Sequence, residues 1–237
     1  MKKFLVTMGL VAFAVVGCDD SSSASAGPND EPGIESSSSS SGKVTEPAEV
    51  TSSSSKDPEL AEESFTDNRD GHTYKTVTIG TQTWMAENLN YETANSYCYN
   101  DNSANCTKYG RLYTWGAAKT ACPSGWHLPD TTEWKTLFTA VGGSSTAGTK
   151  LKSTSAWNNS GNGTDAFGFS ALPAGGRDGY EDYYYEGYYA DFWSSTEDST
   201  EDGSDCAYFM RLYYSYDYAD LNNNYKFYGF SVRCLKD

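Results

Sequence analysis

The chain has 237 residues and a formal net charge of −15, with 32 Asp and Glu against 17 Lys and Arg. Nucleic acid is bound by basic surfaces, so this acidic balance argues against a nucleic-acid partner. Tyrosine is unusually frequent, with 19 residues, and most of them follow Tyr180.

The first 18 residues predict a lipoprotein signal peptide. Two lysines follow the first residue, an apolar run covers residues 4–16, and Gly17 precedes Cys18. The run is shorter than the roughly 20 residues that a membrane-spanning helix needs, and its basic start is typical of an export signal. Bacterial lipoprotein processing attaches lipid to a cysteine directly after the cleavage point. We therefore expect lipidated Cys18 to anchor the protein to a membrane of the cell envelope, at the outer membrane or the cell surface.

A disordered linker is predicted over residues 19–64. This segment is rich in serine, proline and acidic residues, with serine runs at 21–23, 36–41 and 52–55. It buries too little apolar surface to offset its chain entropy. We expect it to act as a tether that holds a folded domain away from the membrane. A second cleavage site, Ala-Ser-Ala at 24–26, fits ordinary secretion and leaves that alternative open.

One folded domain is expected over residues 65–237, which contain all six tryptophans. This length suits a single domain with a substantial core. A strand over residues 74–79, a turn at 80–81 and a returning strand over 83–87 predict a hairpin near its start.

Two helices are predicted next. The first covers residues 112–122, with apolar residues along one side, and Pro123 ends it. The second begins at Asp130, whose spacing from Glu133 predicts a capping box, and a pair of glycines ends it. Its apolar residues have helical spacing and are Trp134, Leu137, Phe138 and Val141.

Short antiparallel strands are expected after the second helix. We place them over residues 168–172, 192–195, 207–214 and 229–234. Two helices followed by several short strands predict an α+β domain.

Five cysteines lie in the domain, and an oxidising compartment favours their pairing. Cys98 and Cys106 bracket a short polar loop, and we expect them to form a disulfide. Cys122 and Cys234 are the next pair, which joins a helix end to the last strand, and Cys206 is left over. Connectivity does not follow from sequence alone. A zinc site is the rival interpretation, but the chain has no C-x-x-C motif and its two histidines lack ligand spacing.

Seven stretches of the domain resemble the Fibrobacter succinogenes major paralogous domain family, and they occur in the expected order. They are IGTQTWMAENLNY (79–91), YGRLYTWGAA (109–118), CPSGWHLPDTTEW (122–134), KLKSTSAW (150–157), GFSALPAGGR (168–177), WSSTE (193–197) and YGFSVRCLKD (228–237). The resemblance implies a C-type-lectin-like fold, distantly similar to the domain of formylglycine-generating enzymes. It also implies an exported, often lipid-anchored protein, and it implies no particular chemistry.

No catalytic site and no cofactor are expected. The sequence has no G-x-S-x-G motif and only two histidines. Formylglycine-generating chemistry would need a reactive cysteine pair, and no motif around Cys206 or Cys234 supports one. We interpret His127 as a hydrogen-bonded, partly buried residue. Arg233 is interpreted as half of a structural ion pair with an acid such as Glu133 or Glu87.

Tyrosines and acids are interspersed between residues 178 and 228. Aromatic faces stack on sugar rings, and carboxylates accept hydrogen bonds from sugar hydroxyls. Non-catalytic recognition of an extracellular polysaccharide is therefore the preferred function. The same rings suit an envelope protein partner, which would make the chain a structural or assembly component of the cell envelope. Ordinary half-buried strand residues are the third interpretation. Tyr185 belongs to the same loop platform, and the residues expected to bind the ligand are Tyr183, Tyr184, Tyr188 and Tyr189.

An acidic loop over residues 197–205 is the remaining candidate site. Calcium takes about 6–8 oxygen ligands, but the pattern D-x-[DN]-x-[DN]-G is missing from the sequence. A solvated acidic loop is therefore favoured over a metal site. The acids of this loop are Glu197, Asp198, Glu201, Asp202 and Asp205.

Overall fold

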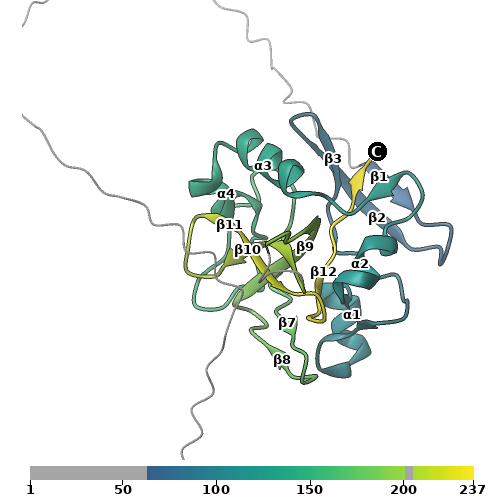
Figure 1. Cartoon of the computed structure of the whole chain (residues 1–237). Coiled ribbons are helices and arrows are strands. Elements are labelled where there is room, and N and C mark those ends of the chain that lie inside the picture. Colours follow the sequence, from purple (N-terminus) through teal and green to yellow (C-terminus); the bar gives the residue numbers. More distant parts are fainter. Residues whose placement is uncertain (1–62, 201–204) are drawn as a thin grey trace, which may run out of the picture. The chain divides into compact units, whose positions relative to one another are not determined.

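The computed structural model describes residues 63–200 and 205–237. The predicted signal peptide, the lipidation site at Cys18 and nearly all of the predicted linker lie outside these residues. The described part is a mixed α+β domain, as predicted, with its strands in three sheets (Figure 1). None of the helices in this part is long and apolar enough to cross a membrane.

A five-stranded sheet holds both ends of the described chain, in the order β1-β2-β3-β13-β6. The predicted hairpin is confirmed, because β2 and β3 pair antiparallel with Ile79 opposite Gln82, and Gly80 in the turn has a φ of 62°. The first strand, β1, begins just before the predicted domain boundary. The strands are Glu63–Thr66 (β1), Thr73–Ile79 (β2), Gln82–Met85 (β3), Trp126–His127 (β6) and Leu235–Lys236 (β13).

A six-stranded sheet follows the order β11-β10-β9-β12-β5-β4. Its strands β9, β10 and β11 form an antiparallel meander, and β12 runs parallel to β9. A separate hairpin pairs Gly176–Arg177 (β7) with Tyr183–Tyr184 (β8). The strands of the large sheet are Ser96–Tyr97 (β4), Leu112–Tyr113 (β5), Tyr189–Glu197 (β9), Cys206–Tyr213 (β10), Ala219–Tyr225 (β11) and Phe230–Ser231 (β12).

Two of the four predicted strands correspond to strands of this sheet. Of the other two, one is much shorter than predicted and one is not a strand. Residues 192–195 lie in β9, and residues 207–214 correspond to β10 apart from the last. Residues 229–234 contain only the short strand β12. Residues 168–172 form no strand, since their only ladder contact is an isolated bridge from Ala171 to Lys152.

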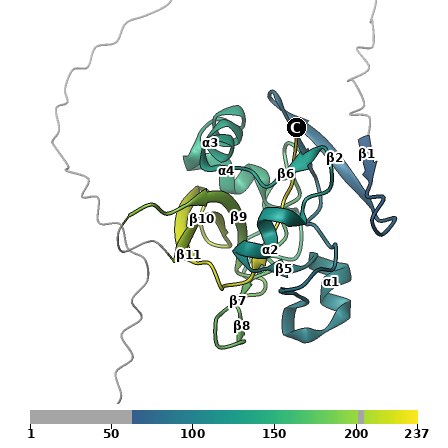
Figure 2. The ribbon, with the colours of Figure 1, turned by 45° about the vertical axis from the view of Figure 1, so that its right-hand side comes forward.

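The described residues contain four α-helices rather than the two predicted, and a short 3₁₀ turn, Tyr99–Asp101 (η1). α3 and α4 pack against the meander, and α2 packs against β5 and β9 (Figure 2). The two unpredicted helices, α1 and α4, are rich in serine and threonine and lack a long apolar stripe. The helices are Ser103–Tyr109 (α1), Trp115–Ala121 (α2), Thr131–Ala140 (α3) and Ser144–Leu151 (α4).

The predicted capping box is confirmed at the start of α3. The Glu133 amide donates to Asp130 Oδ1 at 2.8 Å, and the Asp130 amide donates to Glu133 Oε2 at 2.8 Å. The earlier helix starts three residues later than predicted. Leu112 and Tyr113 are drawn into strand β5, where they pair with β12 and β4.

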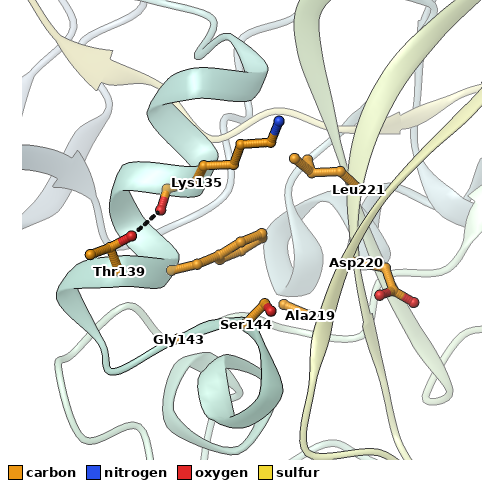
Figure 3. A pocket seen from close by; sticks show the side chains of 8 residues that line it. Lys135, Thr139, Gly143, Ser144, Ala219, Asp220 and Leu221 are labelled. Atoms are coloured by element: carbon orange, nitrogen blue, oxygen red, sulfur yellow. Dashed lines mark hydrogen bonds between the residues drawn. The ribbon is translucent and has the colours of Figure 1, made fainter. Parts of the chain in front are cut away.

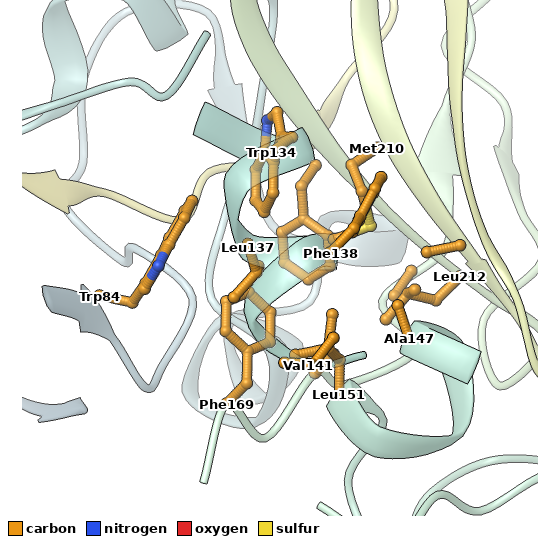
Figure 4. Packing of buried hydrophobic residues seen from close by; sticks show 14 of the residues in the cluster. Trp84, Trp134, Leu137, Phe138, Val141, Ala147, Leu151, Phe169, Met210 and Leu212 are labelled. Carbon is orange, nitrogen blue, oxygen red and sulfur yellow. The ribbon is translucent and has the colours of Figure 1, made fainter. Parts of the chain in front are cut away.

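The largest core cluster lies between α3, α4 and the meander (Figure 4). The Trp84 and Trp134 rings stack at a centroid distance of 4.8 Å, and Phe169 meets Trp84 edge-on at 5.8 Å. All three side chains are fully buried. The four apolar residues that we assigned to the core face of the second helix are buried as predicted.

Arg233 is fully buried and does not form the predicted ion pair with an acid. Its guanidinium instead donates to the Asn88 side-chain oxygen at 2.6 Å, to the Met85 carbonyl at 3.2 Å and to the Phe169 carbonyl. Burial lowers the pKa of Arg233 to about 9, although Asp165 and Glu87 oppose this shift electrostatically. Through these hydrogen bonds, the charged guanidinium of Arg233 links the C-terminal segment to β3 and to the loop that contains Phe169.

Both predicted disulfides are present. Cys98 is bonded to Cys106, and Cys122 is bonded to Cys234 across a sequence separation of 112. Cys206 is fully buried at the start of β10, and no cysteine of the described chain is free, so Cys206 is not a spare thiol. Disulfides persist in oxidising compartments, which indicates a domain located outside the cytoplasm.

Candidate functional site

Strand register brings five tyrosines into one contiguous group, here called the tyrosine row: Tyr185, Tyr189, Tyr213, Tyr216 and Tyr218. Tyr189 and Tyr213 are direct partners on β9 and β10, with ring centroids 5.3 Å apart. Tyr185 lies 4.5 Å from Tyr189 at one end of the row. At the other end, Tyr216 and Tyr218 stack at 4.8 Å, each also in contact with Tyr213.

The outer rings of the row are accessible to a ligand. Tyr185 is 53% exposed and Tyr216 is 48% exposed, whereas the three rings between them are half-buried. Burial raises the pKa of Tyr213 to about 12, and it also raises the pKa of Tyr189 above its usual 10.0. These hydroxyls stay protonated at neutral pH, so each one can donate a hydrogen bond as well as accept one.

A tight turn between β8 and β9 fixes the position of Tyr185. Tyr185 has a φ of 61°, and its carbonyl accepts hydrogen bonds from the amides of Tyr188 and Tyr189. Gly175 runs beside this turn with a φ of 65°, and a Cβ atom there would lie 2.2 Å from the Tyr184 carbonyl oxygen. Glycine is therefore required for the two segments to approach each other.

A buried ion pair supports the middle of the row. Arg211 Nε lies 2.7 Å from Asp191 Oδ1, and the adjacent guanidinium nitrogen lies 2.8 Å from Asp191 Oδ2. The guanidinium also lies 4.8 Å from the centre of the Tyr189 ring and 5.8 Å from that of Tyr213. Although burial lowers the pKa of Arg211, the Asp191 carboxylate more than offsets this effect, so Arg211 stays charged.

A second aromatic group, here called the aromatic corner, consists of Tyr225, Phe227 and Tyr228. Tyr225 and Phe227 stack at 5.1 Å with an interplanar angle of 8°, and Phe227 is 52% exposed. Tyr184 connects the corner to the row, since its ring contacts Tyr228 at 6.3 Å and Tyr185 at 5.3 Å. A chain of ring contacts through the partly buried Tyr184 therefore links the two groups.

The structure separates the four tyrosines that the sequence singled out. Only Tyr189 belongs to the row, and Tyr184 lies at its edge, joined to the core cluster around Trp193. Tyr188 packs against Tyr214 at 5.1 Å. Tyr183 turns toward η1, where its hydroxyl donates to Asp101 Oδ1 at 2.6 Å.

Most members of the row were missed because they come from β10 and from the turn that follows it. Tyr213, Tyr216 and Tyr218 follow the loop residues by some 25 positions or more and reach them only through the pairing of β9 with β10. The alternation of residues in β10, which places Arg211 and Tyr213 on one face, is the signal that could have found them.

A shallow hollow of about 370 Å³ lies on the other side of β11, between α3 and α4 (Figure 3). Its lining includes Lys135, Phe138, Thr139 and Leu221. The Thr139 hydroxyl donates to the Lys135 carbonyl at 2.9 Å, so it has a structural partner. The lining contains no nucleophile paired with a base, and the hollow offers no catalytic arrangement.

His127 is hydrogen-bonded on both ring nitrogens, which confirms its interpretation as a partly buried, satisfied residue. Its Nε2 lies 2.9 Å from Glu133 Oε1, and its Nδ1 lies 2.7 Å from Asp237 Oδ1. Burial lowers the pKa of His127, but the hydrogen bonds to Asp237 and Glu133 outweigh this and raise it above 6.5.

The acidic loop is only partly described, because residues 201–204 lie outside the structure. Asp198 is buried rather than solvated, and it accepts hydrogen bonds from the Thr200 amide at 3.0 Å and from the Asn223 amide group at 2.8 Å. Glu197 is paired with Lys226. Within the described residues, no group of three or more His, Cys, Asp or Glu is arranged to hold a metal ion.

Comparison with known proteins places the domain in a family. No curated protein and no solved structure matches the chain. The model of the family described as the Fibrobacter succinogenes major domain matches residues 77–236, a stretch that extends from β2 to β13 and contains the whole tyrosine row. This match agrees with the seven sequence motifs. The chain therefore belongs to the Fibrobacter succinogenes major domain family.

Proposed function

We propose that the protein is a lipid-anchored recognition protein of the cell envelope that binds extracellular polysaccharide, without catalysis, through the tyrosine row. The observation that carries this proposal is the contiguity of the five rings, whose two outer members are about half exposed. Apolar rings that gather at the surface often mark a binding site.

The chemistry of the row suits sugar rings. Flat aromatic faces pack against the C–H-rich faces of sugars, while tyrosine hydroxyls exchange hydrogen bonds with sugar hydroxyls. The Arg211–Asp191 pair holds the central rings from below. A ligand would therefore meet side chains that are already ordered, which reduces the entropy lost on binding.

A second candidate function is that of a structural or assembly component that binds an envelope protein. The aromatic corner favours it, since Phe227 is 52% exposed and carries no hydroxyl to bond a sugar. Large, rigid aromatic side chains of this kind also suit protein partners. Crosslinking on intact cells distinguishes the two, because this function requires capture of a defined envelope protein that a Phe227→Ala variant no longer captures.

The C-type-lectin-like fold and the lipid anchor belong to the same proposal. Strands from the two ends of the described chain, β1 and β2 at the start and β13 at the end, lie in one sheet, which supports the proposed fold. The two disulfides support an exported domain. Lipidation is proposed from the Cys18 motif alone. Mass spectrometry of the native protein should find an acylated Cys18 as the first residue, and recovery of an uncleaved, unmodified start would refute the anchor.

A pull-down on insoluble cellulose and xylan tests the binding function. We expect the wild-type protein to be retained and the Tyr185→Ala/Tyr216→Ala double variant to lose at least tenfold in retention. Both rings are about half exposed, so the fold should survive, which thermal unfolding can verify. Tyr180→Ala is the matched control, because Tyr180 is 89% exposed and outside the row. Equal retention of the double variant and the control would refute the proposal.

A further inference from the structure

We infer that Asp220 sets the ligand class of the tyrosine row: its carboxylate accepts hydrogen bonds from the hydroxyls of a neutral polysaccharide and repels polysaccharides that carry carboxylates or sulfates. This inference rests on the proposed function, which it narrows from polysaccharides in general to uncharged ones.

The register of the meander places Asp220 beside the rings. Asp220 on β11 is directly opposite Arg211 on β10, so the two side chains share a face of the sheet. Tyr213 and Tyr218 are two residues away from Arg211 and Asp220 respectively, and both lie on this face. Asp220 is one of the residues that line the hollow next to β11, and Figure 3 shows its carboxylate on the opposite side of the strand from the side chain of Leu221.

Two cations that contact residues of the row, Arg211 and Lys152, already have partners within the protein. Arg211 is engaged by both carboxylate oxygens of Asp191. Lys152 donates to the carbonyls of Tyr213 at 2.9 Å and Tyr216 at 3.1 Å, so its ammonium group points into the protein. A ligand on the row therefore meets no free cation from these two residues, and an anionic polysaccharide would gain no ion pair with them.

Asp220 differs in this respect from Asp217, an acid in the turn that leads into β11. Asp217 Oδ1 accepts a hydrogen bond from the Thr149 hydroxyl at 2.6 Å, and Asp217 interacts electrostatically with Lys152. Asp220 forms no ion pair within the described part of the chain, although Arg211 is close enough to interact with it electrostatically. Asp220 thus contributes a negative charge next to the rings that a ligand would contact.

The Asp220 carboxyl group is partly withdrawn from water, and the Tyr213 hydroxyl is the side-chain hydrogen-bond donor beside it. Burial raises the pKa of this carboxyl group above its usual 3.8, despite the opposing effects of the Tyr213 hydroxyl and Arg211. A carboxylate that has lost part of its hydration gains more from new donors than a fully solvated one does. The hydroxyls of a neutral sugar stacked on Tyr213 or Tyr218 can supply such donors, whereas a second carboxylate cannot.

The test compares two derivatives of the same polymer. Full-length protein is applied to immobilised hydroxyethyl cellulose, which is neutral, and to carboxymethyl cellulose, which is anionic, at low ionic strength. We expect the wild type to bind the neutral polymer at least tenfold more tightly than the anionic one. Asp220→Asn keeps the shape of the side chain and removes its charge. It should weaken binding to the neutral polymer about tenfold and reduce the ratio between the affinities for the neutral and the anionic polymer.

Asp217→Asn is the matched control, because it removes the same charge three residues earlier in the chain and should leave both affinities within about twofold. Equal effects of Asp220→Asn and Asp217→Asn would show that binding depends on the overall charge and not on Asp220 in particular, and would overturn the inference. Wild-type behaviour of Asp220→Asn, together with loss of binding in Tyr216→Ala, would also overturn the inference while leaving the proposed function intact. Binding of the wild type to neither polymer, or unchanged binding of Tyr216→Ala, would count against the proposed function itself.

Discussion

Asp191 and Arg211 face each other across β9 and β10 and form a two-pronged ion pair beneath the tyrosine row. Asp191 is 1% exposed, so both oxygens of its carboxylate have exchanged water for the guanidinium. Burying each charge costs desolvation free energy, and the attraction between the two charges offsets that cost only while both are present. The arrangement makes the two residues strongly interdependent for stability.

Removing one member of this pair should therefore destabilise the domain strongly. We expect Asp191→Ala to lower the free energy of unfolding by roughly 3–5 kcal/mol, since it leaves the Arg211 charge mostly buried without a partner. Urea denaturation followed by tryptophan fluorescence measures this loss. The double variant Asp191→Leu/Arg211→Met should recover most of it, because it removes both charges together. A double variant as unstable as Asp191→Ala would contradict this account.

Features that depend on local sequence were predictable. The hairpin of β2 and β3 follows from alternation around a glycine-containing turn, and α3 follows from the capping box at Asp130 and the spacing of four apolar residues. Both disulfides were also predicted, one of them from the short loop that it closes. Each of these features is determined by residues close in sequence or by a small number of cysteines.

Features that depend on distant partners were not predictable. β11 has the sequence ADLNNNY, and its asparagines disfavour a strand, yet pairing with β10 along its whole length imposes one. Residues 112 and 113 have a helical pattern, but β12 and β4 recruit them as a strand. Arg233 was predicted to form an ion pair because acidic side chains can be read from the sequence. Its actual acceptors include the backbone carbonyls of distant residues, which every residue carries and which no sequence pattern marks.

The sequence predicted that the candidate site is rich in tyrosine, but not which tyrosines form it. The excess of tyrosine after residue 180 correctly indicated an aromatic region. Which rings come together depends on the register of β9 with β10, where Tyr189 meets Tyr213. A count of tyrosines in one loop therefore selected Tyr183 and Tyr188, whose side chains make other contacts.

The two disulfides should differ in their contribution to stability. In the chain-entropy account, the loop closed by Cys122 and Cys234, with a sequence separation of 112, is worth about 4.8 kcal/mol, whereas the eight-residue step from Cys98 to Cys106 is worth about 2.5 kcal/mol. Paired serine substitutions, compared by thermal unfolding, should show the larger fall in Tm for the Cys122/Cys234 variant. An equal or reversed order would show that the closed loops do not govern the effect.

The cap of α3 gives a smaller and more local prediction. Asp130→Ala removes the acceptor for the Glu133 amide and should cost about 1 kcal/mol of unfolding free energy. Asp130→Asn is the control, because asparagine is an equally good N-cap residue and should stay within a few tenths of a kcal/mol of the wild type. Equal losses in the two variants would mean that the carboxylate charge, and not the cap hydrogen bond, is what matters.

His127 should make stability depend on pH in the neutral range. Its two partners, Glu133 and Asp237, are both acids, and their hydrogen bonds raise its folded pKa above the unfolded value of about 6.5 despite the opposing effect of burial. The folded state therefore binds the proton more tightly than the unfolded state. The resulting stabilisation is complete below pH 6.5 and is lost as the pH rises through the folded pKa.

We expect the unfolding free energy of the wild type to fall between pH 5.5 and pH 8.5 relative to that of His127→Gln, by a modest amount because the histidine is 38% exposed and solvent weakens both ion pairs. Urea titrations at four pH values across this range measure the difference in slope. The same pH dependence in wild type and His127→Gln would show that the two acids do not bind the imidazolium more tightly in the folded state.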